Sequence, residues 1–311
     1  MIVDLPDTST GVVAKRIVEV RESGGAISLG RVLTLVVVAE HDEPTEGAIS
    51  AAIDASREHP SRVIVVSRGD ENDDTRLDAQ IRVGGDAGAS EVVVLALHGE
   101  LAAHPQSVVI PFLLPDTPVV TWWPGTAPSH PAADPMGMLG TRRLLDASKD
   151  PHPDTVLARR LANYCAGDSD ITWTQITPWR GILASAVDRP PHEAITAVDV
   201  SGPSKSPAID LLAGWLRAAL GVPTRRSIGS FEVRLHRAGG PTVLAIDENS
   251  NAVLTAPGKP DGRIALIRRN LPMCLAEELR RLDADDIYAL ALAGAAEVET
   301  VERATVGRIS E

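Results

Sequence analysis

The sequence is poor in cysteine and contains no segment long and apolar enough for a membrane. Two cysteines, Cys165 and Cys274, occur in 311 residues, which is too few for a disulfide framework, and neither belongs to a CxxC motif. We therefore expect both thiols to behave as small buried side chains. No apolar run is as long as a membrane span, and the first residues lack the basic and apolar segments of a signal peptide. These absences predict a cytoplasmic protein with no membrane partner.

Metal-binding and catalytic motifs are missing as well. The eight histidines form no HExxH motif and no cluster with cysteine, so the sequence predicts no metal site. It contains no GxSxG motif, and neither cysteine lies in a motif typical of a nucleophile. The glycine-rich segment 24–30 precedes an expected strand, whereas a dinucleotide-binding loop follows a strand and opens a helix. Nothing in the sequence therefore indicates a catalytic constellation.

The sequence has few basic residues for its acidic content: 30 Lys and Arg against 42 Asp and Glu, which gives a formal net charge of −12. This balance excludes general nucleic-acid binding, which needs a basic surface. The share of hydrophobic residues, 44%, is that of an ordinary globular protein. Since single cores rarely grow beyond about 250–300 residues, a chain of this length predicts two domains.

Hydrophobic patterns predict an α/β fold with mixed sheets in two domains, residues 1–167 and 168–311. Each half reads as a strand, a helix, three strands and a helix, an order that an internal duplication would produce. In the first half these elements are residues 32–39, 45–58, 62–67, 77–83, 91–97 and about 100–115. In the second half they are residues 194–200, 206–220, 231–236, 242–246, 263–268 and 271–282.

Aromatic residues make up only 3% of the chain, yet four of its five tryptophans lie between residues 122 and 179. Pro178 fits the first position of a helix after a break, which would place Trp173, Trp179 and Arg180 on one bent helical corner. Trp122 and Trp123 end a strand and must point to opposite faces. Tryptophan and arginine anchor many protein interfaces, so we expect these five residues to bind a partner. The alternative is that Trp173 and Trp179 belong to the domain cores, which base rates favour because tryptophan is highly buried on average.

The loop formed by Ser204, Lys205 and Ser206 runs from an expected strand to the N-terminus of an expected helix. Backbone N–H groups and the helix dipole favour an anion at such a position. The loop lacks the GxxxxGK[ST] spacing of a phosphate-binding loop. Plain N-capping by Ser206 explains it without a ligand. Both interpretations, an anion site and a helix cap, remain open.

Four segments carry a resemblance to a known family. They are ITWTQITPWRGILA at 171–184, VVTWWPG at 119–125, SPAIDLLAGWL at 206–216 and LAEELRRLD at 275–283. Taken in chain order, they resemble OpcA, the glucose-6-phosphate dehydrogenase assembly protein family. The resemblance implies an allosteric activator without catalysis or a cofactor, which binds the dehydrogenase, favours its active oligomer and raises the NADPH supply of the oxidative pentose phosphate pathway. It assigns no contact residues, so the tryptophan interface is our own inference. The alternative function is a sugar-phosphate-binding enzyme or sensor that uses the loop at residues 201–206.

Overall fold

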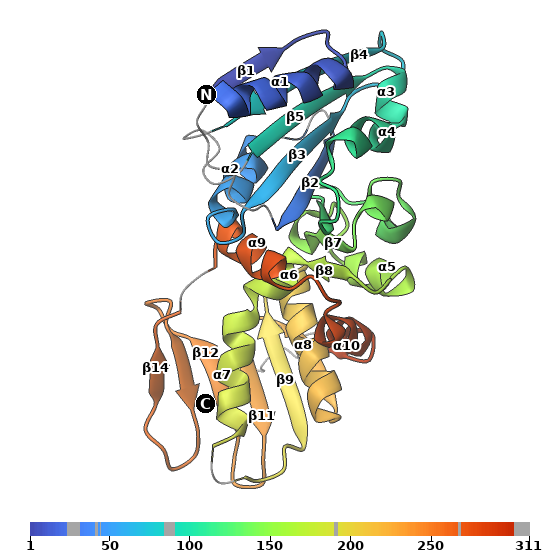
Figure 1. Cartoon of the computed structure of the whole chain (residues 1–311). Helices are drawn as coiled ribbons and strands as arrows, with labels where there is room; N and C mark the ends of the chain where they lie inside the picture. Colours follow the sequence, from blue (N-terminus) through green and yellow to red (C-terminus); the bar gives the residue numbers. More distant parts are fainter. Residues whose placement is uncertain are drawn as a thin grey trace. The chain divides into compact units, whose positions relative to one another are not determined.

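The structure is a computed structural model that describes residues 1–23, 32–40, 43, 45–83, 91–189, 192–266 and 269–301. The glycine-rich segment 24–30 lies outside the described residues. The chain forms two compact units, each with its own mixed sheet and helices (Figure 1). The expected fold class, two α/β domains, is confirmed. Unit 1 contains Met1–Pro151, Asn163–Thr174 and Arg269–Asp285, and unit 2 contains His152–Ala162, Gln175–Arg268 and Asp286–Glu311.

Within its described residues, unit 1 has an eight-stranded sheet in the order β1-β4-β5-β3-β2-β6-β7-β8. From β5 to β8 neighbouring strands are parallel, whereas β4 is antiparallel to both β5 and β1. The direction of winding reverses between β2 and β6, as in doubly wound sheets. The strands are β1 (Ile2–Leu5), β2 (Leu33–Glu40), β3 (Ser61–Arg68), β4 (Arg76–Arg82), β5 (Glu91–His98), β6 (Val119–Trp122), β7 (Arg142–Leu145) and β8 (Asp168–Asp170).

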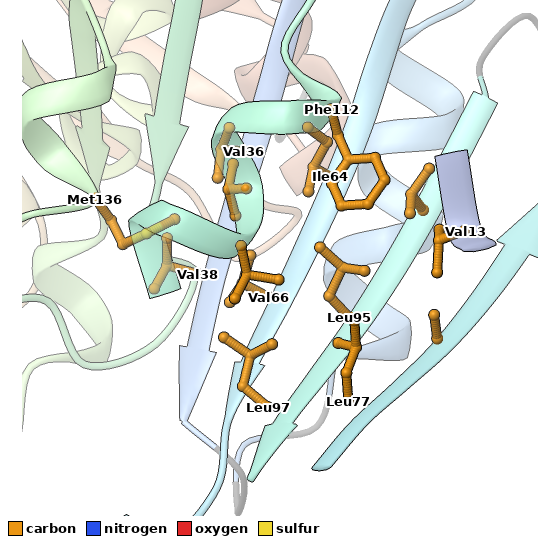
Figure 2. Packing of buried hydrophobic residues seen from close by; sticks show 14 of the residues in the cluster. Val13, Val36, Val38, Ile64, Val66, Leu77, Leu95, Leu97, Phe112 and Met136 are labelled. Carbon is orange, nitrogen blue, oxygen red and sulfur yellow. The ribbon is translucent and has the colours of Figure 1, made fainter. Parts of the chain in front are cut away.

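Both faces of this sheet are buried because its central strands carry apolar residues at successive positions. In β2, Val36 and Val38 belong to one cluster, which includes side chains of α1, and Figure 2 shows it with Phe112 among the strand residues. Leu35 and Val37 belong to a second cluster, which includes side chains of α2 and α9. The strand expected at residues 32–39 is therefore confirmed as β2, and it is buried on both faces. The helices are α1 (Thr10–Ser23), α2 (Glu46–Ala55), α3 (Glu100–Ala103), α4 (Pro105–Val109), α6 (Ile171–Gln175) and α9 (Leu271–Arg280).

Unit 1 is discontinuous in sequence, whereas the sequence pattern suggested a single division after residue 167. The chain returns to unit 1 with α9, whose Leu275 and Leu279 pack into the cluster around α2. The division at residue 167 stays a prediction for the folding domains. The position of α9 implies that residues 269–285 belong with the N-terminal part in any truncated protein.

Unit 2 contains, in its described part, a seven-stranded sheet in the order β14-β13-β12-β11-β9-β10-β15. β9, β10 and β15 are parallel to one another. On the other side of β9, the neighbouring strands β11, β12, β13 and β14 pair antiparallel in that order. The strands are β9 (Ala197–Gly202), β10 (Thr224–Ile228), β11 (Glu232–His236), β12 (Thr242–Ile246), β13 (Ala252–Thr255), β14 (Gly262–Ile264) and β15 (Glu299–Val301). The helices are α5 (Val156–Ala162), α7 (Thr177–Val187), α8 (Pro207–Leu220) and α10 (Asp286–Ala295).

The side chains of unit 2 alternate between a buried and a more exposed face of the sheet. Val198 and Val200 of β9 are buried, whereas Asp199 and Ser201 between and beyond them are half-buried. The buried face includes Gly202, which contacts Ile209 of α8. The opposite face borders an open groove of about 550 Å³. Unit 2 therefore presents a broad surface on one side of its sheet.

The best-specified helix of the sequence is confirmed as α8. Ser206 is its N-cap residue, Pro207 lies in its first turn, and Gly221 ends it in the left-handed conformation at φ 67°. Three strands of unit 2 were not expected, β10, β13 and β15. The strand expected at 263–268 is the short β14, with residues 267 and 268 outside the described part. In β10 the buried positions are Thr224 and Arg226. Because these buried side chains are polar, β10 lacks the apolar–polar alternation that predicts a strand from sequence.

Candidate partner-binding site

The tryptophan corner is a break between two short helices, as the sequence predicts. α6 ends at Gln175, Ile176 adopts φ −87° and ψ 1°, and α7 begins at Thr177 with Pro178 in its first turn. Proline fits there because its missing N–H is one of the groups that a helix start leaves unbonded. Ile176 is the N-cap residue of α7 and makes no side-chain cap hydrogen bond.

Trp173 lies in the core of unit 1 and is 1% exposed. Its Nε1 donates a hydrogen bond to Oδ2 of Asp285 at 2.9 Å. The next residue, Thr174, donates its hydroxyl to the Glu278 carboxylate, which also pairs with Arg142 at 2.6 Å. These bonds hold α6 to α9 and β7. Trp173 is therefore a core residue, as the alternative interpretation of the tryptophans predicted.

Trp122 and Trp123 point to opposite faces of the unit 1 sheet, as predicted. Trp122 is fully buried in the cluster that includes α2 and α9, and Trp123 is 3% exposed in the cluster that includes α1. A side chain buried to this extent cannot contact a partner while unit 1 stays folded. We therefore correct our expectation and withdraw Trp122, Trp123 and Trp173 from the proposed contact surface.

Trp179 differs from the other tryptophans of the corner, because it belongs to unit 2 and is half-buried. Its ring packs on Phe231, with centroids 4.2 Å apart and a 45° angle between the planes. Arg180, also half-buried, donates a hydrogen bond from Nη2 to Oγ1 of Thr177 at 2.9 Å. Phe231 lines the open groove beside the exposed face of the sheet. Sequence reasoning missed Phe231, because the pairing joins residues far apart in the chain.

Phe231 of the aromatic pair has apolar neighbours along the groove. Ile228 at the end of β10 is 57% exposed and Ile246 at the end of β12 is 38% exposed, and both line the groove with Phe231. Exposed isoleucines beside a partly exposed aromatic pair are typical of a contact surface. We call Trp179, Arg180, Phe231, Ile228 and Ile246 the aromatic patch.

The loop of Ser204, Lys205 and Ser206 lies between β9 and α8, as expected. Lys205 adopts φ 54° and its Nζ lies 3.1 Å from the carboxylate of Asp154. The Asp210 carboxylate accepts a hydrogen bond from Arg226 at 2.8 Å, and burial raises its pKa. Two carboxylates near the loop oppose the binding of an anion. The anion site stays an untested prediction, and the surroundings favour a structural role.

Buried carboxylates form a second polar cluster, in unit 1. Asp146 directly follows β7 and Asp170 is the last residue of β8, and both are almost fully buried. The Asp170 carboxylate accepts hydrogen bonds from the backbone N–H of Thr172 at 2.8 Å and of Ala147 at 3.1 Å. Burial, and next the Asp146 carboxylate, raise the pKa of Asp170 to about 7. Sequence reasoning missed this cluster because no motif connects the two residues.

The topological switch point of unit 1, between β2 and β6, is where doubly wound sheets commonly bind ligands. Glu40 at the end of β2 pairs with Arg68, and Glu43 accepts a hydrogen bond from the backbone N–H of Thr126 at 2.8 Å. Two carboxylates at this edge are unfavourable for a phosphate group. No group of three or more His, Cys, Asp or Glu that could hold a metal ion occurs among the described residues.

Comparison with known protein families gives two matches. The model described as the glucose-6-phosphate dehydrogenase subunit N-terminal domain matches residues 52–162, and the corresponding C-terminal domain model matches residues 166–292. A search of curated proteins found no match. In the part of the chain that the structure describes, no helix is long and apolar enough to cross a membrane.

Similar solved structures are remote. A Magnetospirillum magnetotacticum protein described as a candidate oxidoreductase is 12% identical, with a TM-score of 0.38, and the match covers 86% of this chain and 99% of that one. An Escherichia coli structure described as trehalose-6-phosphate bound with UDP-2-fluoro glucose is 11% identical, with a TM-score of 0.26, and the match covers 63% and 64%. These scores are too low to support an argument about function. The two family matches, which together span most of the chain and both of its units, show that the protein belongs to the OpcA family of glucose-6-phosphate dehydrogenase assembly proteins.

Proposed function

We propose that this protein binds glucose-6-phosphate dehydrogenase, promotes its assembly and activates it allosterically without a catalytic step of its own. The family match over residues 52–162 and 166–292 carries this proposal. In a cell the result would be a larger NADPH supply from the oxidative pentose phosphate pathway.

Activation by binding requires that the protein prefer one state of the dehydrogenase. Each tenfold shift of the equilibrium toward the active oligomer needs about 1.4 kcal/mol of differential binding free energy. Hot spots of protein interfaces are typically aromatic or arginine side chains surrounded by apolar contacts. The aromatic patch of unit 2 has this composition. We therefore assign the contact with the dehydrogenase to Trp179 and Arg180, with Phe231 as the support of the indole.

The experiment combines a titration of the cognate dehydrogenase with the purified protein and a measurement of the dehydrogenase oligomer by sedimentation. We expect a saturable rise in activity and a shift of the dehydrogenase to a larger assembly. Wild-type protein that neither binds nor activates the dehydrogenase would refute the function.

Trp179→Ala tests the contact surface. Truncation of an interface anchor costs at least about 2 kcal/mol, so affinity for the dehydrogenase should fall roughly thirtyfold. Trp215→Ala is the matched control, because Trp215 is also a half-buried tryptophan of unit 2 and lies outside the aromatic patch. A variant of Trp179 that melts early but binds normally would place the residue in the core.

A further inference from the structure

A pocket of about 240 Å³ lies in unit 2, away from the aromatic patch. Its walls are the β11–β12 turn, the β13–β14 turn and the end of α7, which lie at the same end of the sheet because β11 and β13 run antiparallel to β12 (Figure 1). Gly240 has φ 113° and approaches Pro257 so closely that an added Cβ would lie 2.7 Å from the proline Cγ. The two turns therefore pack directly on each other and form a fixed wall.

The pocket is positively charged although the chain as a whole carries a net charge of −12. Arg189, Arg237 and Lys259 line it, and Glu193 is its carboxylate. Arg237 is half-buried, whereas Arg189 and Lys259 are exposed. Glu193 accepts a hydrogen bond from the backbone N–H of Gly239 at 2.9 Å. Three cations around one carboxylate give the pocket an excess of positive charge, which favours an anionic ligand.

The remaining lining residues are apolar and indicate what the carbon part of such a ligand is like. Ala186 and Leu254 are buried residues of the core and reach the pocket together with Pro257 and Pro260. This apolar surface suits a small carbon skeleton, which a bare phosphate ion lacks. The lining contains no aromatic side chain on which a nucleobase would stack.

We propose that this pocket binds a small, non-aromatic phosphate ester, with the phosphate held by Arg237 and Lys259 and the carbon chain against Leu254. The site is distinct from the loop at residues 201–206, where Lys205 is paired with Asp154. It is also independent of the proposed contact with the dehydrogenase, because none of its lining residues belongs to the aromatic patch. A ligand bound in this pocket would therefore act as an effector through unit 2, without contact with the aromatic patch.

Isothermal titration calorimetry on the full chain, without the dehydrogenase and at low salt, tests the proposal. The probes are glucose 6-phosphate, glucose, inorganic phosphate and adenosine monophosphate. We expect glucose 6-phosphate to bind with a Kd below about 1 mM, at least tenfold tighter than phosphate, and glucose not to bind. Tighter binding of the nucleotide, or equal binding of phosphate and glucose 6-phosphate, would overturn the ligand class.

Charge variants locate the site. Arg237→Gln and Lys259→Gln should each weaken binding of glucose 6-phosphate about tenfold or more, because each removes a charge-assisted hydrogen bond. Lys205→Gln is the control, because it removes the same charge outside the pocket, and it should leave the affinity for glucose 6-phosphate unchanged. Melting curves of all three variants show whether each is folded. No binding to the wild-type protein, or loss of binding only in Lys205→Gln, would refute the pocket, and neither result bears on binding to the dehydrogenase.

Discussion

Asp170 should destabilise the native state at neutral pH, and Asp170→Asn should remove this effect. The carboxylate is fully buried beside Asp146, with hydrogen bonds only from hydroxyl and backbone groups among its identified contacts. Its pKa is raised from 3.8 to about 7. Between these two values the native state binds a proton that the unfolded state has lost. The free energy of unfolding therefore falls as the pH rises from about 4 to 7, and the loss is complete above pH 7.

The magnitude follows from the same two values. One pKa unit corresponds to 1.36 kcal/mol, so a rise from 3.8 to about 7 corresponds to a loss of about 4 kcal/mol in wild-type stability. Asparagine at position 170 does not titrate, and its amide oxygen can still accept the N–H groups of Thr172 and Ala147. Relative to wild type, Asp170→Asn should gain about 1.4 kcal/mol per pH unit between about pH 4 and 7, with no further gain at higher pH.

Asp168→Asn is the matched control on the same buried strand. Asp168 pairs with the buried guanidinium of Arg143, and its second oxygen accepts the N–H of Cys165 at 3.0 Å. Loss of the carboxylate leaves Arg143 with no ionised partner on β8, and breaking a buried pair in this way costs about 3–5 kcal/mol. Two substitutions of Asp by Asn, two residues apart, should therefore have opposite effects at pH 8.

Denaturant unfolding followed by tryptophan fluorescence from pH 4 to 9 measures both variants, since Trp122 and Trp173 report on unit 1. Titrations that both proteins share cancel in the difference between variant and wild type. A difference for Asp170→Asn that does not change with pH would show that the carboxylate is already ionised in the native state. If Asp170→Asn lowered the free energy of unfolding at pH 8 as much as Asp168→Asn does, the reasoning would be refuted altogether.

Four further predictions concern packing and thiol chemistry. A Cβ at Gly214 of α8 would lie 2.5 Å from a backbone nitrogen of α10, so Gly214→Ala should lower the free energy of unfolding by about 1–3 kcal/mol in denaturant unfolding. Gly181→Ala, in α7 with open space around it, should instead raise that free energy by up to about 1 kcal/mol. Burial raises the pKa of Cys274 to about 11, so mass spectrometry after alkylation at pH 8 should find label on the partly exposed Cys165 first, and equal labelling would contradict the buried thiol. Trp173→Ala should cost about 3–5 kcal/mol of folding stability, and normal melting of this variant would return the residue to the surface.

The sequence by itself determined the elements whose pattern depends on local chemistry. The run at 33–39, which is apolar except for Thr34, predicts a strand buried on both faces, because a run this short and rich in valine suits such a strand better than a helix. Pro207 and Gly221 mark the two ends of α8, as the bonding needs of helix termini predict, whereas the N-cap residue Ser206 makes no side-chain cap hydrogen bond. Pro178 specifies the break between α6 and α7 for the same reason. The resemblance of four segments also predicted the family, which both family matches confirm.

The tertiary structure decided which side chains meet and which are exposed. β8 consists of Asp168, Ser169 and Asp170, and no apolar pattern could predict a buried strand whose polar groups find partners elsewhere in the fold. The same holds for Trp173 and Trp179, which lie six positions apart in similar local sequence. One is bonded to Asp285 in a core, and the other packs on Phe231 at a surface. Their roles differ because burial depends on residues that are distant in sequence, and only the folded chain brings those residues to them.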